Sequence, residues 1–218
     1  MDYTISYRPN RKTLCLQVSP TNQVRVLVPV GVTDSQIDAF VQAKQSWLKR
    51  VMDRQAERQA NRLTYTDGET VWYLGRSLTL RVSSVDSAIV LMADTLIIPN
   101  AIDRRRMVID WYVDRADEII PDRVECYAES MSVRPNQVRI KSQRTKWGSC
   151  SSLGNIALNW RLIMAPMPVL DYVVVHELCH LMHMDHSTRF WQAVESVMPR
   201  YKEHRRWLKD HGYMLDLI

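Results

Sequence analysis

The 218-residue sequence has few glycines and prolines, 6 and 9, and it has no long uninterrupted apolar run. The scarcity of these two residues excludes a collagen-like chain, and 46% apolar with 24% charged residues is typical of a globular protein. A membrane-spanning helix needs about 18 apolar residues, but the apolar stretch at 173–175 is bounded by Asp171 and His176. The first residues lack the basic and apolar segments of a secretory signal. We therefore expect a cytoplasmic protein with no membrane partner.

Cysteine is also scarce, and its spacing excludes two classes of small domain. Cys15, Cys126, Cys150 and Cys179 are far apart and form no C-x-x-C pair. A zinc ribbon needs such paired ligands, and a disulfide framework needs a higher density of cysteine in a shorter chain. We expect reduced, buried thiols.

The net charge of +5 lies entirely in the last part of the chain. Residues 134–218 carry 12 Lys and Arg against 7 Asp and Glu, whereas residues 1–133 sum to zero. Such an excess indicates either a solvated basic surface or a surface that attracts nucleic acid. The second interpretation rests on a basic stretch in which alternation places two members on one strand face: Arg134, Arg139, Lys141, Arg144 and Lys146.

Apolar periodicity predicts an α+β fold with a boundary near residue 100. Period-two alternation predicts antiparallel strands within residues 3–28, and short strands again within 69–99. Between them, Thr33 and Gln36 have the spacing of a capping box, which predicts one long helix with a polar tail at 53–62. Residues 1–100 are thus expected to be a β-rich region with one long helix.

The second part, residues 101–218, is expected to be mainly helical. A helix is predicted from about 102 to 130, where Pro121 either breaks it or begins a new helix. Two strands are predicted at 137–141 and 155–162, joined through a glycine-containing turn at Gly148. After Pro168 a helical pattern continues almost to the end of the chain.

One motif in this part points directly to chemistry, because residues 176–180 read H-E-x-x-H. On a helix, positions i and i+4 share a face, so His176 and His180 can offer two imidazole nitrogens to one metal ion. Glu177 projects beside them, where it can take a proton from water at the metal. The preceding apolar residues indicate a buried helix and not a loop. The motif predicts a catalytic zinc site.

A catalytic zinc site needs a third protein ligand and an open position. His186 lies six residues after His180, as in the metzincin pattern, although His183 stands where that pattern has glycine. We favour His186 over His183, and we expect Asp185 to orient a ligand or to cap the helix that follows. The other candidates for the third ligand are His204, His211 and Glu195.

Three separated motifs together resemble the YgjP-like metallopeptidase family, which is related to the SprT-like and WLM zinc peptidases. They are R-T-K-W-G-S-C-S-S at 144–152 with N-I-A-L-N-W-R-L-I at 155–163, H-E-L-C-H at 176–180, and H-M-D-H-S at 183–187. The resemblance covers residues 134–211 and is more diffuse in the N-terminal part. It implies a gluzincin-like or minimal zincin fold, Zn2+ on His176, His180 and His186, and Glu177 as the catalytic base.

The W-G-S-C segment also has a physical interpretation of its own. Strands beside a zincin active-site helix can offer a sheet edge to an extended peptide, which makes Trp147, Gly148 and Ser149 the substrate-binding candidates. Trp160 is expected to be core. A peptidase also needs a donor for the developing oxyanion, and the candidates follow the Met198-Pro199 turn: Tyr201, His204 and Arg205.

The expected function is therefore a zinc-dependent metallopeptidase acting on a peptide or protein substrate. The alternative is a nucleic-acid-associated protein or a DNA-linked protease that uses the basic surface. Because the relatives of the family include the SprT-like peptidases, this alternative stays open at the level of sequence. A structural zinc domain is disfavoured, since Glu177 has no role in a closed, cysteine-rich site.

Overall fold

The computed structural model describes residues 2–19, 21–60, 62–143 and 145–216. The chain divides into two compact units, Met1–Arg62 and Leu63–Ile218. The secondary structure is a mixture of helices and sheets, so the predicted α+β class is confirmed. In this described part of the chain, no helix combines the length and the apolar character of a membrane-spanning segment.

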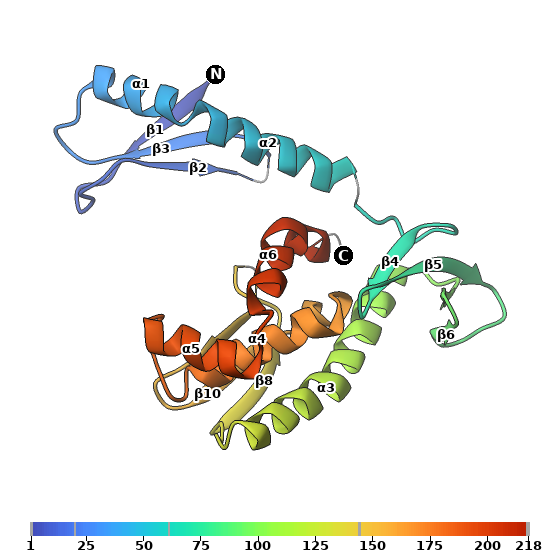
Figure 1. The fold of residues 1–218 in the computed structure, drawn as a ribbon. Helices are drawn as coiled ribbons and strands as arrows, with labels where there is room; N and C mark the ends of the chain where they lie inside the picture. The colour runs from blue at the N-terminus through green and yellow to red at the C-terminus, as the bar shows by residue number, and fades with distance from the viewer. Residues whose placement is uncertain (1, 20, 61, 144, 217–218) are drawn as a thin grey trace. The chain divides into compact units, whose positions relative to one another are not determined.

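The first unit is a three-stranded sheet with two helices (Figure 1). Its elements are β1 (Tyr3–Tyr7), β2 (Cys15–Val18), β3 (Val24–Val28), α1 (Asp34–Ala43) and α2 (Gln45–Ala60). The strand order is β1-β3-β2, and β1 pairs with β3 in parallel, whereas β2 pairs with β3 in the predicted antiparallel manner. The prediction of antiparallel strands throughout was therefore wrong for β1, which pairs with β3 and not with β2, the next strand in the sequence. Such a pairing is no hairpin, so the two strands can run parallel.

The predicted capping box is present, but the single long helix is not. The Thr33 hydroxyl accepts from the Gln36 backbone, and the Gln36 side chain accepts from the Thr33 backbone. The helix then ends at Lys44, whose N–H donates to the carbonyl of Val41, and α2 begins at the next residue. The break lets Val41 on α1 and Leu48 on α2 both pack on the sheet.

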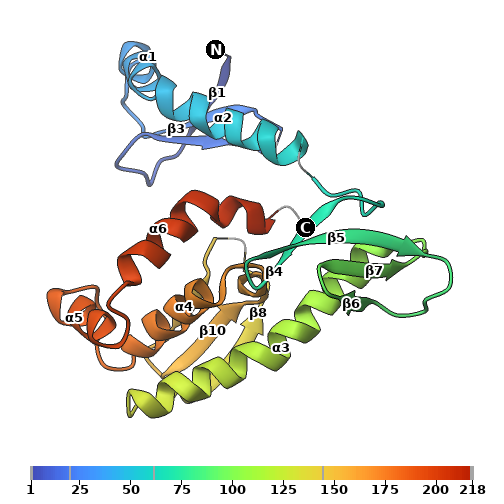
Figure 2. The same cartoon turned by 45° about the vertical axis from the view of Figure 1, so that its right-hand side comes forward.

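The second unit begins with a four-stranded sheet that lies against a long helix (Figure 2). The strands run in the order β4-β5-β7-β6, close to the predicted positions, and the helix is α3. Their bounds are β4 (Thr70–Tyr73), β5 (Arg76–Ser83), β6 (Val90–Met92), β7 (Thr95–Pro99) and α3 (Arg104–Ser130).

The expected boundary near residue 100 lies inside this unit. Leu80 and Ile98 of the sheet share one core with Tyr112 of α3 and with the helices that follow. The Tyr112 hydroxyl also donates to the carbonyl of Trp72, at 2.6 Å. Strands 70–99 therefore belong with the C-terminal elements, because their apolar face has no other core to pack on.

Pro121 neither breaks α3 nor starts a new helix, so both predicted alternatives were wrong. The helix is continuous from Arg104 to Ser130 with Pro121 inside it. A buried side chain recurs at every fourth position on both sides of the proline: Val108, Tyr112, Ala116, Ile120, Val124 and Ala128. Burial of this stripe offsets the hydrogen bond that proline cannot donate.

The remaining elements form the part of the molecule that carries the motifs. A second sheet has the order β8-β10-β9, and five helical segments follow it in the described residues. Their bounds are β8 (Gln137–Lys141), β9 (Gly148–Cys150), β10 (Asn155–Asn159), η1 (Trp160–Met164), α4 (Met167–Cys179), α5 (Thr188–Val197), α6 (Tyr201–His211) and η2 (Gly212–Asp216).

Two details of this sheet differ from the prediction. The strand expected at 155–162 ends at Asn159, where η1 begins, and the buried Trp160 belongs to η1. The segment expected to be a turn is itself the strand β9, which pairs antiparallel with β10. The thiols also differ in part: all four are free, but only Cys179 is buried and Cys126 is exposed.

Candidate metal centre and active-site cleft

The helix α4 places the H-E-x-x-H motif in the interior of the second unit. Three consecutive β-branched valines at 173–175 disfavour an isolated helix. Here they are fully buried, as are most residues of α4, so tertiary packing overrides the propensity. Prolines at 166 and 168 stand at the start, where a missing N–H does not matter.

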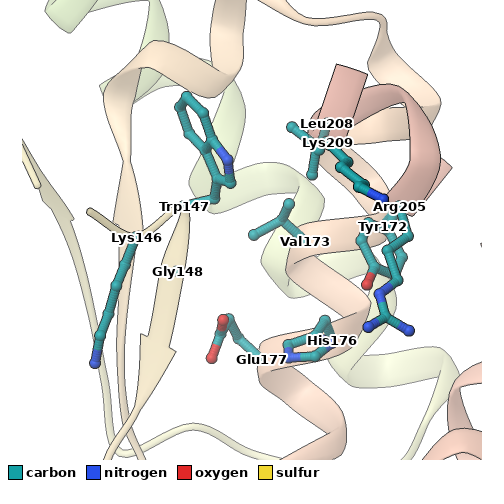
Figure 3. Close-up of a pocket in the computed structure, with 10 residues that line it drawn as sticks. All are labelled: Lys146, Trp147, Gly148, Tyr172, Val173, His176, Glu177, Arg205, Leu208 and Lys209. Carbon is teal, nitrogen blue, oxygen red and sulfur yellow. The ribbon is translucent and has the colours of Figure 1, made fainter. Parts of the chain in front are cut away.

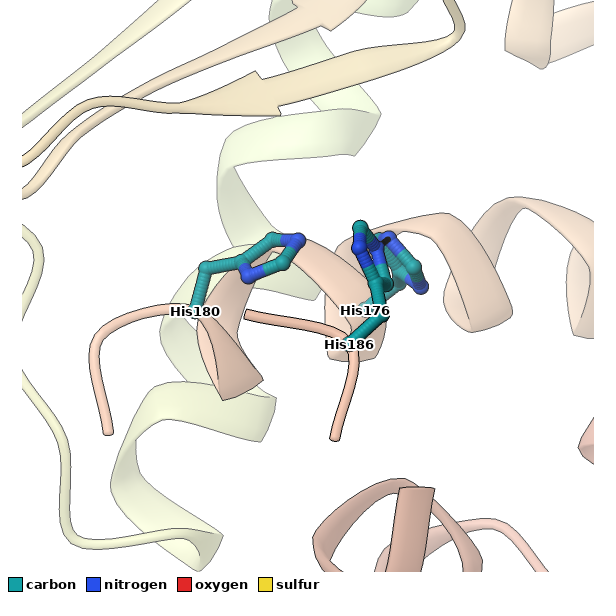
Figure 4. Close-up of side chains that lie close together, drawn as sticks. All are labelled: His176, His180 and His186. Atoms are coloured by element: carbon teal, nitrogen blue, oxygen red, sulfur yellow. Dashed lines mark hydrogen bonds between the residues drawn. The ribbon is translucent and has the colours of Figure 1, made fainter. Parts of the chain in front are cut away.

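Three histidines come together at the end of α4 (Figure 4). His176 and His180 lie one turn apart, and His186 comes from the segment that connects α4 to α5. One ring nitrogen from each lies within 4.8 Å of the others, and the Nε2 atoms of His176 and His186 are 3.2 Å apart. In the described residues this is the one group of histidine, cysteine and carboxylate side chains that could hold a metal ion.

The donor set and its spacing fit a zinc ion. Imidazole nitrogens bind zinc at about 2.0–2.1 Å, so two ligands in a tetrahedral site lie about 3.3 Å apart. The separation of 3.2 Å between His176 and His186 matches this value. Three histidines would also leave one tetrahedral position open, as catalytic sites require.

Aromatic residues of α5 hold the three imidazoles in place. The Phe190 ring is fully buried and lies 4.5 to 4.9 Å from all three histidine rings, stacked on that of His180. Trp191 lies 5.8 Å from His176 and from His186. This packing restricts the rotamers of the rings before any metal binds.

His183 contributes to the metal centre through its backbone carbonyl and not through its side chain. Its carbonyl oxygen lies 3.0 Å from His180 Nδ1, so this Nδ1–H donates to it and leaves Nε2 for a metal. The comparable atom of His176, Nδ1, is buried without a hydrogen-bond partner among the described residues. Asp185 accepts from the backbone N–H of Ser187, just before α5, and is not part of the cluster.

Burial keeps two of these histidines neutral. Desolvation, with smaller contributions from His180, His186 and Arg205, lowers the pKa of His176 to about 3. Desolvation also lowers the pKa of His180. Neutral imidazole is the form that binds a metal.

Glu177 lies beside the cluster and faces β9 (Figure 3). Only 5% of the residue is exposed, and burial raises the pKa of its carboxyl to about 7, although Lys146 opposes the shift. A Cβ atom on Gly148 would lie 2.5 Å from Glu177 Oε1. Glycine at this position therefore leaves the space that the carboxylate occupies.

We expect Gly148→Ala to lower the free energy of unfolding and any activity that depends on Glu177, while metal binding by the three histidines is retained. The added methyl overlaps Glu177, and overpacking of this kind costs about 1–3 kcal/mol. Thermal unfolding measures the stability, cleavage of an unstructured protein measures the activity, and metal content shows whether the metal is retained. In a Glu177→Ala background the destabilisation should largely disappear; an equal cost in both backgrounds would show that another contact is responsible.

Glu177 and His176 line a cavity of about 380 Å3 between β9 and α6, over α4. Its lining residues are Lys146, Trp147, Gly148, Tyr172, Val173, His176, Glu177, Arg205, Leu208 and Lys209. Of the substrate-binding candidates, Trp147 and Gly148 line this cleft, whereas Ser149 does not. Among the candidate oxyanion donors only Arg205 does so, and its guanidinium lies 4.8 Å over the Trp191 ring.

Sequence reasoning missed Tyr172, which lies one turn before His176 on the same helix face. Its ring is 5.9 Å from that of His176, and burial raises the pKa of its hydroxyl to about 12. The i, i+4 spacing from His176 could have indicated it.

An ion pair between the buried Asp171 and the half-buried Arg123, also missed, ties α4 to α3. Both carboxylate oxygens of Asp171 accept from Arg123, at 2.7 and 2.8 Å, and Tyr127 donates to the same carboxylate. The sequence offered one indication of this pair, since Asp171 is a charged residue within an otherwise apolar stretch, and a buried charge needs a partner.

Asn159 holds the segment that leads into β9. Its buried side-chain amide donates to the carbonyls of Gln143 and Lys146, and its backbone N–H donates to the carbonyl of Trp147. These three bonds position Lys146 and Trp147 at the mouth of the cleft.

The family of the chain follows from its similarity to known protein families. The YgjP-like, metallopeptidase domain family matches residues 12–211. The chain belongs to this family. It is therefore a metallopeptidase, which implies a metal ion and a protein or peptide substrate.

The chain is also similar to one solved structure, described as "Crystal structure of the metallopeptidase zymogen of Pyrococcus abyssi abylysin". The identity is 27%, with 42% of this chain and 94% of that chain covered, and the TM-score is 0.39. A search of curated proteins gave no match.

The described members of the basic stretch predicted from the sequence stand on different segments of the chain. Arg139 and Lys141 are exposed on one face of β8, as expected from alternation. Lys146, however, lines the cleft, and Arg144 lies outside the described residues. The family match points to peptide substrates and gives the nucleic-acid hypothesis no support.

Proposed function

We propose that this YgjP-like protein is a zinc-dependent peptidase with His176, His180 and His186 as the metal ligands. The observation that carries the proposal is the convergence of three histidine nitrogens beside a buried glutamate in an open cleft. When bound, zinc supplies Lewis acidity toward a water molecule and a peptide carbonyl. A closed structural site would instead be four-coordinate, and a carboxylate such as Glu177 would have no role there.

In this mechanism Glu177 moves the proton. Its carboxylate accepts a proton from the attacking water as the new C–O bond forms. It then passes the proton to the leaving nitrogen as the peptide C–N bond breaks, which yields a carboxylic acid and an amine. General-base and general-acid assistance of this kind contributes about 10²–10⁴-fold in rate. The cavity contacts of Glu177 and its position beside His176 support this role.

We propose that the substrate lies extended along β9. In the described residues β9 pairs with β10 alone, so its other edge is available to a peptide backbone. Trp147 and Gly148 contribute the wall of the cleft at this edge, and Ser149 follows them on the strand.

Arg205 is the proposed donor to the developing oxyanion. It lines the same cavity as Glu177, and its charge acts on His176, whereas Tyr201 is stacked between Tyr172 and Trp191. The position over Trp191 limits the motion of the guanidinium, which favours stabilisation of charge without reorganisation.

The function is tested by hydrolysis of an unstructured protein such as casein. We expect cleavage by the purified protein, loss of cleavage with a chelator, and recovery when zinc is returned. Cleavage that persists unchanged in the chelated protein would contradict a metal-dependent mechanism.

A further inference from the structure

The cleft carries positive charge that the proposed mechanism leaves unused. Apart from Glu177, the permanently charged residues that line it are all basic: Lys146, Arg205 and Lys209. Lys146 precedes β9, whereas Arg205 and Lys209 belong to α6, so both walls of the cleft contribute positive charge (Figure 3). Arg205 is the proposed oxyanion donor and the charge of Lys146 acts on Glu177, but neither Lys146 nor Lys209 has a proposed contact with the substrate.

These cations also lack carboxylate partners. Within the described ranges, no carboxylate lies within 4 Å of Lys146, Arg205 or Lys209. On and beside α6, two other basic side chains are paired with carboxylates: Arg200 with Glu203, and Lys202 with Glu195. Three cations without an ion pair in the described residues therefore line this one cleft.

A cleft with charges of one sign and apolar walls concentrates its potential on whatever enters it. Trp147, Val173 and Leu208 supply the apolar surface between the cations. A substrate with a carboxylate near the scissile bond would meet Lys146 and Lys209, whereas a basic side chain there would be repelled.

We propose that the cleft selects peptides that carry a carboxylate close to the scissile bond. This inference rests on the proposed function, since it concerns the substrate of the same site. The carboxylate can come from an acidic side chain or from the C-terminus of a peptide, because both present the same group.

Binding to the Glu177→Gln protein tests the selectivity without turnover. The probes are fluorescently labelled neutral octapeptides: one with a central Glu, one with a central Gln, both amidated, and the Gln peptide with a free C-terminus. We expect the Glu peptide to bind about fivefold more tightly than the amidated Gln peptide, the size that one or two exposed charge pairs give. If instead the Gln peptide with a free C-terminus binds more tightly than the amidated Gln peptide, the cleft recognises the carboxylate at the end of the peptide.

The charge variants are made in the same Glu177→Gln background. Lys146→Gln combined with Lys209→Glu should remove the preference for the carboxylate. Lys202→Glu, which makes the same charge change as Lys209→Glu on the same helix but outside the cleft, should leave it intact. Added salt should weaken the preference, since the cations are exposed.

Equal binding of all three peptides, or no measurable binding of either carboxylate peptide, would overturn the inference. Hydrolysis of casein by the zinc-loaded wild type is measured in parallel. Hydrolysis without selective binding contradicts only the selectivity, whereas selective binding without hydrolysis contradicts the proposed function.

Discussion

Glu177→Gln is expected to keep zinc in place and to lower the rate of hydrolysis by about 10²–10⁴-fold. Glutamine has nearly the same size and retains hydrogen bonding, but it cannot accept the proton of the attacking water. The carboxylate is not needed to hold the metal, because three histidine nitrogens already converge beside it. Zinc content by mass spectrometry and casein cleavage by the same preparation measure the two properties.

Glu195→Gln is the matched control for this experiment. Glu195 is exposed, pairs with Lys202 on the surface and does not line the cleft. It should retain both zinc and hydrolysis. If Glu177→Gln cleaves casein as fast as wild type, the assignment of the general base fails.

His186→Ala is expected to lower zinc affinity by more than about 100-fold, because even loss of an outer-shell partner costs 10–100-fold. His183→Ala should bind zinc nearly as well as wild type. The His183 side chain is outside the cluster, and the carbonyl that orients His180 remains after the substitution. Competition with a chromophoric chelator gives both affinities.

His176→Ala and His180→Ala extend the comparison to the helix. Each should lose zinc as His186→Ala does, since two remaining ligands cannot hold the metal tightly. The opposite ranking, with His183→Ala deficient and His186→Ala normal, would show that the loop after α4 folds differently around the metal.

The sequence predicted much of the candidate site because its residues are local. The H-E-x-x-H motif needs only one helical turn to bring His176 and His180 together. His186 was favoured over His183 from its metzincin-like spacing, but the sequence does not show how the chain turns where that pattern has glycine. Arg205 and Lys209 could be recognised as cleft residues only once α6 was placed against α4.

The errors in the fold come from interactions that are distant in sequence. Nothing within residues 3–28 indicates that β1 pairs in parallel with β3. Pro121 led us to expect a helix boundary, because local propensity takes no account of the buried stripe that stabilises α3 on both sides of the proline. The boundary expected near residue 100 does not separate two units, because Leu80 and Ile98 share one core with Tyr112, which follows it in the sequence.

The central claim is that one zinc ion held by three histidines supports peptide hydrolysis. The most direct measurement is a titration of chelated, metal-free protein with zinc, with bound metal and casein cleavage recorded at each step. We expect cleavage to rise in proportion to bound zinc and to level off at about one ion per chain. Full activity in the metal-free protein, or none at one bound zinc, would contradict it.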